Sequence, residues 1–448
     1  MPADFGASAL RKVRNRLVGF LGLLYFAAFI DRTNVGFAAM QMQRDLGFSD
    51  AVYGLGAGIF FVGYCLFEVP SNLILHRVGA RRWIARIMIT WGLLAGAMAF
   101  VNGPASFYLL RFLLGVAEAG FFPGVVYYLG NWVPAAGRAR LIGAFMTAIP
   151  ISTAVSGPIS SALLRVDGVA GLAGWQWLFL TETLPSLALG IATLRCLTDT
   201  PAAARWLTGV ERAWLSSQLA AERPPRSSPG GDEVLRALRH PRVLALCTCY
   251  FGVELGLYGV IFWIPQILTS AHVGAGALGY AVALPYAVAA PVMVLWCRHS
   301  DRARERVRHI ALAAGIGFLG LAASAYTGGS VLLSLLALTV GVAGTLAVLP
   351  VFWTLPAALL RGAAAAGGIA LINALGNIGG FVGPFAVGWI KTLTGSFAWG
   401  LVVVACGVLA TGILALLLGH DSHAEFGAAG AAAVPEKHAV HNAASPPS

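Results

Sequence analysis

Long apolar stretches separated by short polar breaks run along almost the whole chain. We expect twelve membrane-spanning helices, because a spanning helix needs roughly 20 mostly apolar residues. The expected spans of the first half are 17–38, 52–75, 83–101, 106–129, 141–164 and 176–197. Those of the second half are 243–267, 277–297, 310–327, 331–353, 366–389 and 398–418.

One long polar segment separates the two sets of spans. It contains RPPRSSPGGDE, whose Pro, Gly and Ser content is typical of a linker. Trp206, Val210, Trp214 and Leu215 recur within it at helical spacing, which predicts an amphipathic helix on the membrane surface. The expected domains are an N-terminal segment, a first six-helix bundle, this linker, a second bundle and a disordered tail, at 1–16, 17–198, 199–242, 243–419 and 420–448.

The composition is that of a helical membrane protein. Of the 448 residues 58% are hydrophobic and 11% charged, and the mean hydropathy is +0.77. The 55 glycines suit a protein whose spanning helices approach one another closely. We therefore expect an all-α protein embedded in a lipid bilayer.

The basic residues gather in alternate breaks between the spans. Of the 30 Lys and Arg residues, 25 lie on the side of the N-terminus and three, Arg44, Arg165 and Lys391, on the opposite side. Because positive residues accumulate on the cytoplasmic side, both termini are predicted to be cytoplasmic in a multi-pass inner (plasma) membrane protein. Topology thus accounts for the net charge of +11, and no nucleic-acid partner is expected.

Sequence motifs of enzymes and metal sites are missing from the chain. The six cysteines show no CxxC or Cys/His spacing, and there is no HExxH, nucleophile elbow or phosphate loop. We expect no catalytic residue, no metal and no cofactor. One chain already contains two complete six-helix units, so a functional monomer is expected.

Seven stretches spread over nearly all of residues 16–419 resemble one family of transporters. They are FIDRTNVGFA, FEVPSNLILHRVGARRW, RFLLGVAEAGFFPGVVYYLGNW, GWQWLFLTETLPS, GLYGVIFWIPQIL, HSDRARER and GGIALINALGNIGGFVGP. Together and in this order they resemble the anion:cation symporter family of the major facilitator superfamily, in its bacterial branch of organic-acid and sugar-acid importers of the tartrate, phthalate and galactonate type. One departure is His76, where the superfamily's loop motif usually has an acid, as Asp301 does in the second half.

The resemblance implies a major facilitator fold, with twelve helices in two six-helix bundles around a central cavity. Matching basic loops after the second and eighth spans, HRVGARRW and RHSDRARER, favour such duplicated halves. It also implies a secondary transporter that imports an organic carboxylate by proton symport through alternating access. Its partners would be a small organic anion, protons and the bilayer.

Ionisable residues inside the spans are the candidate functional residues, since a charge at membrane depth is costly. They are Asp31, Arg32, Glu68, Arg111, Glu118, Glu182 and Glu254. Arginine presents a planar fork that matches a carboxylate, and the family pattern places substrate-binding arginines at the positions of Arg32 and Arg111. We expect both to bind the substrate; the alternative is that each pairs permanently with a neighbouring acid.

Two acids near these arginines are candidates for proton coupling. Glu118 follows Arg111 by seven residues, so both face the same way, about 10 Å apart along the helix axis. An apolar cavity favours the neutral carboxyl and a nearby Arg the charged one, a balance that suits proton loading and release. Family members use acids at the positions of Glu118 and Asp31 in this way. Asp31 has a second interpretation, as the fixed partner of Arg32.

Three pairs of polar residues spaced four apart are expected to line the substrate pocket. They are Glu254 and Tyr258, Asn373 and Asn377, and Tyr64 and Glu68. Of the last pair Tyr64 is the expected substrate contact, while Glu68 alternatively braces helix packing near Pro70. The asparagines alternatively hydrogen-bond between helices. Glu182 is expected to be structural.

A drug exporter of the same fold, working by proton antiport, is the main alternative function. Exporters usually carry GPxxGG in the fifth span, whereas this span has TAVSGPISSAL, with Ser160 and Ser161 after Gly157 and Pro158. The difference favours import. A membrane-embedded enzyme or sensor is less favoured, because neither a catalytic motif nor a soluble signalling domain is present.

Overall fold

The computed structural model describes residues 2–134, 141, 145–221, 241–327, 329–359 and 363–419, and these are mostly helical. Eleven of the described helices are long and apolar enough to span a membrane, and the shorter apolar helix Ala148–Leu164 takes the place of the remaining expected span. No strand occurs within the described ranges. The prediction of an all-α membrane protein is confirmed.

The first half of the chain supplies one layer of the molecule. Its helices are α1 (Pro2–Val13), η1 (Arg14–Val18), α2 (Gly19–Leu46), α3 (Asp50–Val78), α4 (Ala80–Ala97), η2 (Met98–Phe100), α5 (Pro104–Glu118), α6 (Phe121–Gly130), α8 (Ala148–Leu164) and α9 (Gly174–Cys196). The helix α10 (Gly209–Ala221) follows them.

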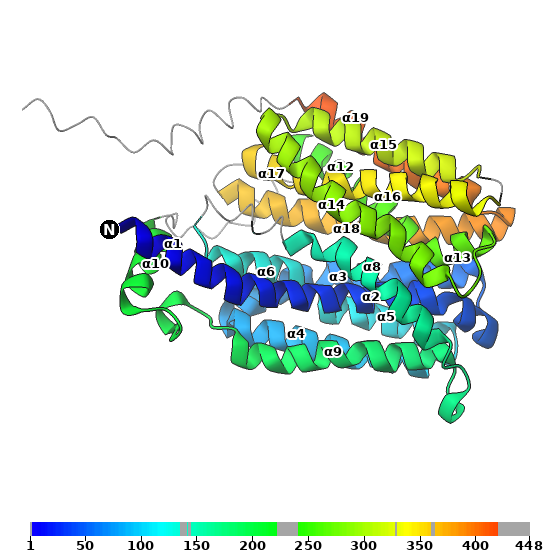
Figure 1. Cartoon of the computed structure of the whole chain (residues 1–448), viewed down its shortest axis with the longest axis horizontal. Helices are drawn as coiled ribbons and strands as arrows, with labels where there is room; N and C mark the ends of the chain where they lie inside the picture. The colour runs from blue at the N-terminus through cyan, green and yellow to red at the C-terminus, as the bar shows by residue number, and fades with distance from the viewer. Residues whose placement is uncertain are drawn as a thin grey trace, which may run out of the picture.

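The second half supplies the other layer. Its helices are α12 (Pro241–Ile261), α13 (Ile264–Ser270), α14 (Leu278–Ala303), α15 (Val307–Ser324), α16 (Val331–Phe352), α17 (Thr354–Leu359), α18 (Ala363–Thr394) and α19 (Ala398–Leu418). In Figure 1 the long helices of both layers run roughly along one axis, with α1 and α10 at one end and α13 at the other. These are called the α1 end and the α13 end below.

Glycines let the two halves approach each other backbone to backbone. A Cβ atom on Gly157 of α8 would lie 2.4 Å from the carbonyl oxygen of Gly279 on α14. One on Gly54 of α3 would lie 2.7 Å from the carbonyl oxygen of Pro384 on α18. Both distances are shorter than a side chain permits, so only glycine allows this closeness. The pairs α8–α14 and α3–α18 therefore fix how the halves meet.

The fourth span is broken in its interior, although the sequence predicts one continuous helix at 106–129. It ends as α5 at Glu118 and restarts as α6 at Phe121. Gly120 between them has φ +84°, a conformation that residues with a side chain rarely adopt. A Cβ there would also lie 2.5 Å from Ser71 Oγ. The break places Glu118 at a helix end inside the molecule.

The amphipathic helix of the linker packs against α1, and its position on a membrane surface stays a prediction. Leu215 and Leu219 of α10 are buried, and the ring of Trp214 lies against Gly6. Lys12 Nζ lies 2.8 Å from Glu211 Oε2 and, with further donors from Thr208 and Ser8, lowers the pKa of Glu211 to about 2. Residues 222–240 of the expected linker and the expected tail at 420–448 lie outside the described residues.

Each of the two matching basic loops is contacted by an acid, but the two acids come from different parts of the chain. In the second half Asp301 Oδ1 accepts a hydrogen bond from Arg306 Nη1 at 2.6 Å, as the loop motif implies. In the first half, where His76 replaces the acid, Asp199 from the segment after α9 accepts one from the backbone N–H of Arg81 at 2.9 Å. A carboxylate therefore remains at the first loop.

Candidate functional site

A small cavity lies between the two halves, near the middle of the helices that line it. Its volume is about 30 Å³, which is room for a few atoms or a water molecule. An organic acid therefore fits only after side chains or helices move apart. The lining residues that the sequence also predicted are Arg32, Tyr64, Glu254, Tyr258, Asn373 and Asn377.

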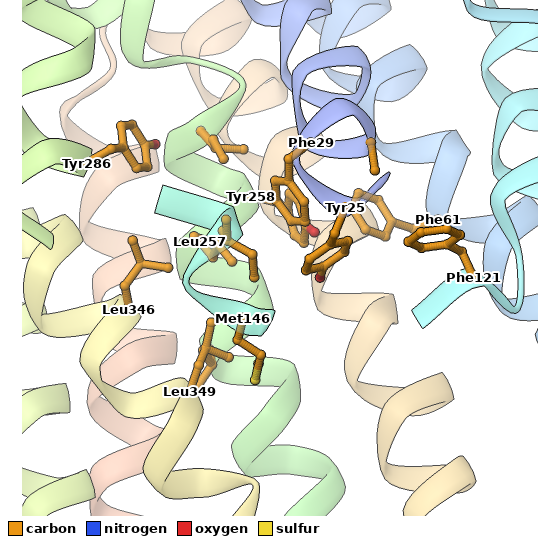
Figure 2. Packing of buried hydrophobic residues seen from close by; sticks show 14 of the residues in the cluster. Tyr25, Phe29, Phe61, Phe121, Met146, Leu257, Tyr258, Tyr286, Leu346 and Leu349 are labelled. Carbon is orange, nitrogen blue, oxygen red and sulfur yellow. The ribbon is translucent and has the colours of Figure 1, made fainter. Parts of the chain in front are cut away.

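Aromatic rings form much of the remaining wall. Figure 2 shows Tyr25, Phe29, Phe61 and Tyr258 gathered at the junction of the halves. The rings of Phe61 and Tyr258 come from different halves, and their centroids are 4.5 Å apart. Sequence reasoning missed Tyr25 and Phe29, although their spacing of seven and three residues from Arg32 puts all three on one helix face.

Arg32 is the basic residue of the central cavity. Its side chain is 8% exposed, and Nη1 donates a hydrogen bond to Tyr258 Oη of α12 at 2.6 Å. Nη2 forms an ion pair with the carboxylate of Glu118 on α5. The guanidinium also lies over the Phe29 ring, 4.8 Å from its centroid. Arg32 thus joins three helices from both halves.

Arg111 lies apart from the cavity wall in this arrangement. Its Nε donates to the carbonyl of Gly56 at 3.2 Å, and its Nη2 donates to the carbonyl of Ala57 at 3.0 Å. The guanidinium lies between the rings of Phe60 and Phe262, at 5.1 Å and 5.7 Å from their centroids. Its buried charge is therefore held by backbone oxygens of α3, and its role in binding substrate stays a prediction.

Asp31 points away from Arg32 and into a polar cluster of the first half. Ser186 of α9 donates its hydroxyl hydrogen bond to Asp31 Oδ2, and Oδ1 is buried without a hydrogen-bond partner. One turn away on α9, Glu182 accepts from Ser160 of α8 at 2.6 Å. The structure therefore does not show Asp31 as the fixed partner of Arg32, since Glu118 holds that place.

Both polar pairs of the second half line the cavity, Glu254 and Tyr258 from α12 and Asn373 and Asn377 from α18. Their contact with the substrate stays a prediction. Asn373 also donates to Glu68 of α3, a hydrogen bond between the two halves. The alternative role of Asn373 in bonding helices together is thus also seen. The described residues contain no group of three His, Cys, Asp or Glu side chains that would hold a metal ion.

Comparison with known proteins assigns the family. Residues 21–384 match the Major Facilitator Superfamily model. The chain is 52% identical to a "Putative tartrate transporter" from Agrobacterium vitis, over 85% of the chain and 84% of that protein. It is 43% identical to a quinolone resistance transporter from Acinetobacter baumannii, over 85% and 88%.

A solved structure shows the same fold at low sequence identity. It is a bacterial homologue of the human lysosomal transporter Spinster in an inward-facing, occupied conformation, with a TM-score of 0.72 and 17% identity, covering 90% of this chain and 96% of that one. The family model spans most of the chain, and the two packed layers of helices agree with it. This chain is a membrane transporter that belongs to the Major Facilitator Superfamily.

Proposed function

We propose that this protein imports an organic carboxylate together with protons across an inner membrane, with both termini in the cytoplasm. The supporting observation is the position of Arg32. Its buried guanidinium meets an acid of its own half, Glu118, and a hydroxyl of the other half, Tyr258. A substrate carboxylate matches the same fork, so it competes for the same donors.

Proton and substrate act on one another through this competition. A proton on Glu118 removes the negative charge that holds Arg32 Nη2, and the guanidinium is then free to bind a carboxylate. After substrate and proton leave on the cytoplasmic side, Glu118 pairs with Arg32 again. Asp31, a carboxylate without a basic partner among the described contacts, is the second proposed proton site. Arg111 is the proposed second anchor of the anion once the cavity widens.

The residues that the second half contributes to the cavity favour a hydroxylated substrate. Glu254 is the carboxylate that the second half contributes, and it lies beside Tyr258, Asn373 and Asn377. A carboxylate there accepts hydrogen bonds from substrate hydroxyls and disfavours a second negative charge close by. The proposal is therefore a hydroxylated or aromatic monocarboxylate in preference to a simple dicarboxylate. Two relatives are named putative tartrate transporters. Tartrate carries hydroxyl groups, which agrees with the proposal, and a second carboxylate, which does not.

Uptake into proteoliposomes tests the proposal. The purified protein is reconstituted, and labelled tartrate, sugar acids and aromatic acids are presented with and without an inward proton gradient. We expect at least one hydroxylated acid to accumulate, and only with the gradient. Equal uptake with and without it would contradict proton symport.

Drug export is the second candidate, because a quinolone resistance transporter is 43% identical over most of both chains. The same vesicles distinguish the two functions. An antiporter accumulates a quinolone when the proton gradient runs outward, whereas a carboxylate symporter accumulates its acid when the gradient runs inward. Quinolone accumulation without any acid uptake would favour export.

A further inference from the structure

A second cavity, separate from the central one, lies at the α13 end of the molecule. Its volume is about 610 Å³, within the range of sites that hold small organic molecules. Exposed residues at its rim include Thr269, Ser270 and Ser396, so it is open to the surface. Further polar groups on its wall are Gln43, Gln266, Ser324, Ser334 and Lys391.

Lys391 is the basic residue on the wall of this cavity, and it also joins the two halves. Its Nζ lies 3.1 Å from Asp50 Oδ1, at the start of α3 in the other half. Gln43 donates to the same carboxylate oxygen at 3.0 Å. The ammonium lies over the Phe397 ring, 4.2 Å from its centroid. Asp50 itself does not line the cavity, so the cation faces the cavity and its partner stands behind it.

Gln266 adds an unused donor beside this cation. Its side chain is 5% exposed, and its Oε1 lies 3.5 Å from Lys391 Nζ. Its Nε2 is buried without a hydrogen-bond partner in the described structure. A buried amide N–H without a partner is unfavourable. Because Nε2 has almost no accessible surface, the amide must turn towards the cavity to donate to an anion there. An ammonium and an amide donor, both buried or half-buried, are the groups that a carboxylate needs.

We propose that this cavity is an outer binding site for a hydroxylated carboxylate, held by Lys391 Nζ and Gln266 Nε2. The proposal rests on the proposed function, which places the α13 end outside the cell. The surrounding hydroxyls of Thr269 and Ser334 suit the hydroxyl groups of such an acid. The arriving anion replaces Asp50 as the partner of Lys391. Substrate therefore loosens an ion pair between α3 and α18 before it reaches the central cavity.

Protection of an engineered cysteine tests the site from outside. Ser270→Cys places a thiol at the cavity rim, and intact cells are labelled with a membrane-impermeant maleimide at increasing concentrations of L-tartrate. Cells that express the chain without Ser270→Cys serve as the control, because they show how strongly the native cysteines are labelled. We expect tartrate to protect the new thiol at the same concentrations when Arg32→Lys has weakened binding at the central site. Lys391→Gln or Gln266→Leu should raise the half-protecting concentration by about tenfold or more.

A charge swap distinguishes anion binding from a merely structural ion pair. Asp50→Lys combined with Lys391→Asp restores the pair between the halves but removes the cation from the cavity. We expect no tartrate protection in the swapped protein. An unchanged half-protecting concentration in Lys391→Gln, protection that returns with the swap, or protection that disappears with Arg32→Lys would overturn the outer site.

The proposed function and the outer site fail in different ways. If the wild-type protein accumulates no acid in vesicles, the proposed function fails, while Lys391-dependent protection by tartrate would still establish an anion site. If acids accumulate normally and protection does not depend on Lys391, only the outer site is wrong.

Discussion

Arg32 and Tyr258 are hydrogen-bonded across the two halves of the protein, with Nη1 of the first 2.6 Å from Oη of the second. The same guanidinium pairs with Glu118, so one side chain contacts both an ionisable acid and the opposite half. A change in the charge of Glu118 therefore reaches the contact between the halves through a single residue.

Arg32→Lys should weaken substrate binding sharply. Lysine keeps the charge but lacks the fork that contacts Glu118 and Tyr258 and that a substrate carboxylate would compete for. Loss of one charge-assisted hydrogen bond costs about 1.5–3 kcal/mol, or a tenfold to hundredfold rise in the apparent KM. The concentration dependence of uptake by reconstituted protein measures it. An unchanged apparent affinity would show that Arg32 does not bind the anion.

The variant Arg111→Lys distinguishes two roles of Arg111, which are binding of the substrate anion and stabilisation of α3. The arginine now satisfies the carbonyls of Gly56 and Ala57, and lysine cannot serve both in the same geometry. We expect weaker substrate binding, and also a lower unfolding temperature, since buried carbonyls lose donors. Thermal unfolding measured beside uptake distinguishes the roles. Lower stability with normal affinity would remove Arg111 from the anion site.

Glu118→Gln should abolish proton-driven accumulation and leave exchange of substrate across the membrane intact. Glutamine keeps the shape of the side chain but carries no titratable proton. Counterflow with substrate on both sides measures exchange, and uptake under a proton gradient measures coupling. Gradient-driven accumulation at the wild-type level would exclude Glu118 as the coupling residue.

Glu254→Gln should change which acids are preferred more than it changes proton dependence. The carboxylate lines the same cavity as Arg32, and in the proposed function it contacts the part of the substrate that differs from one acid to another. A competition profile across mono- and dicarboxylates compares wild type and variant, and dicarboxylates should gain. Identical rankings would mean that Glu254 does not select substrates, and a loss of proton dependence alone would make it a coupling residue.

Glu211 should hold α10 on α1 at neutral pH and release it only in strong acid. Lys12 lowers its pKa from the ordinary 4.5 to about 2, so folding favours the charged form. Such a group stabilises the docked helix above pH 4.5, and the stabilisation is lost as the pH falls towards 2. Hydrogen exchange of α10 amides at pH 6 and pH 3 measures the effect.

Glu211→Gln should raise the rate of hydrogen exchange of the α10 amides already at pH 6. The control variant Ser216→Ala, at an exposed position of the same helix, should not raise it. Slow exchange of α10 in Glu211→Gln at both pH values would show that the apolar contacts of Leu215 and Leu219 suffice.

The spans were predictable because each is a long apolar stretch, and length alone identifies such helices. The break in the fourth span after Glu118 was not predictable. It depends on the positive φ of Gly120 and on the closeness of Ser71 to Gly120. The position of α10 also depends on tertiary contact. An apolar face on a helix predicts burial but does not say whether lipid or α1 covers it.

The sequence suggests candidate residues for the central site and only partly shows how they pair. A spacing of four residues puts Glu254 with Tyr258, and Asn373 with Asn377, on one helix face, and both pairs line the cavity. Their roles in binding substrate stay predictions. Neighbouring residues of a helix point about 100° apart, so Asp31 and Arg32 reach different surroundings despite their adjacency. The contacts of Asp31 with Ser186, and of Glu68 with Asn373, join residues far apart in the chain and needed the fold.

Proton movement driven by substrate tests the central claim most directly. Proteoliposomes that contain a pH-sensitive dye, with no imposed proton gradient, receive an external hydroxylated acid at constant external pH. Symport predicts acidification of the lumen with wild-type protein, much slower acidification with Arg32→Lys at the same acid concentration, and none with Glu118→Gln. Uptake of the acid by wild-type protein without any acidification of the lumen would contradict proton-coupled import through Arg32 and Glu118.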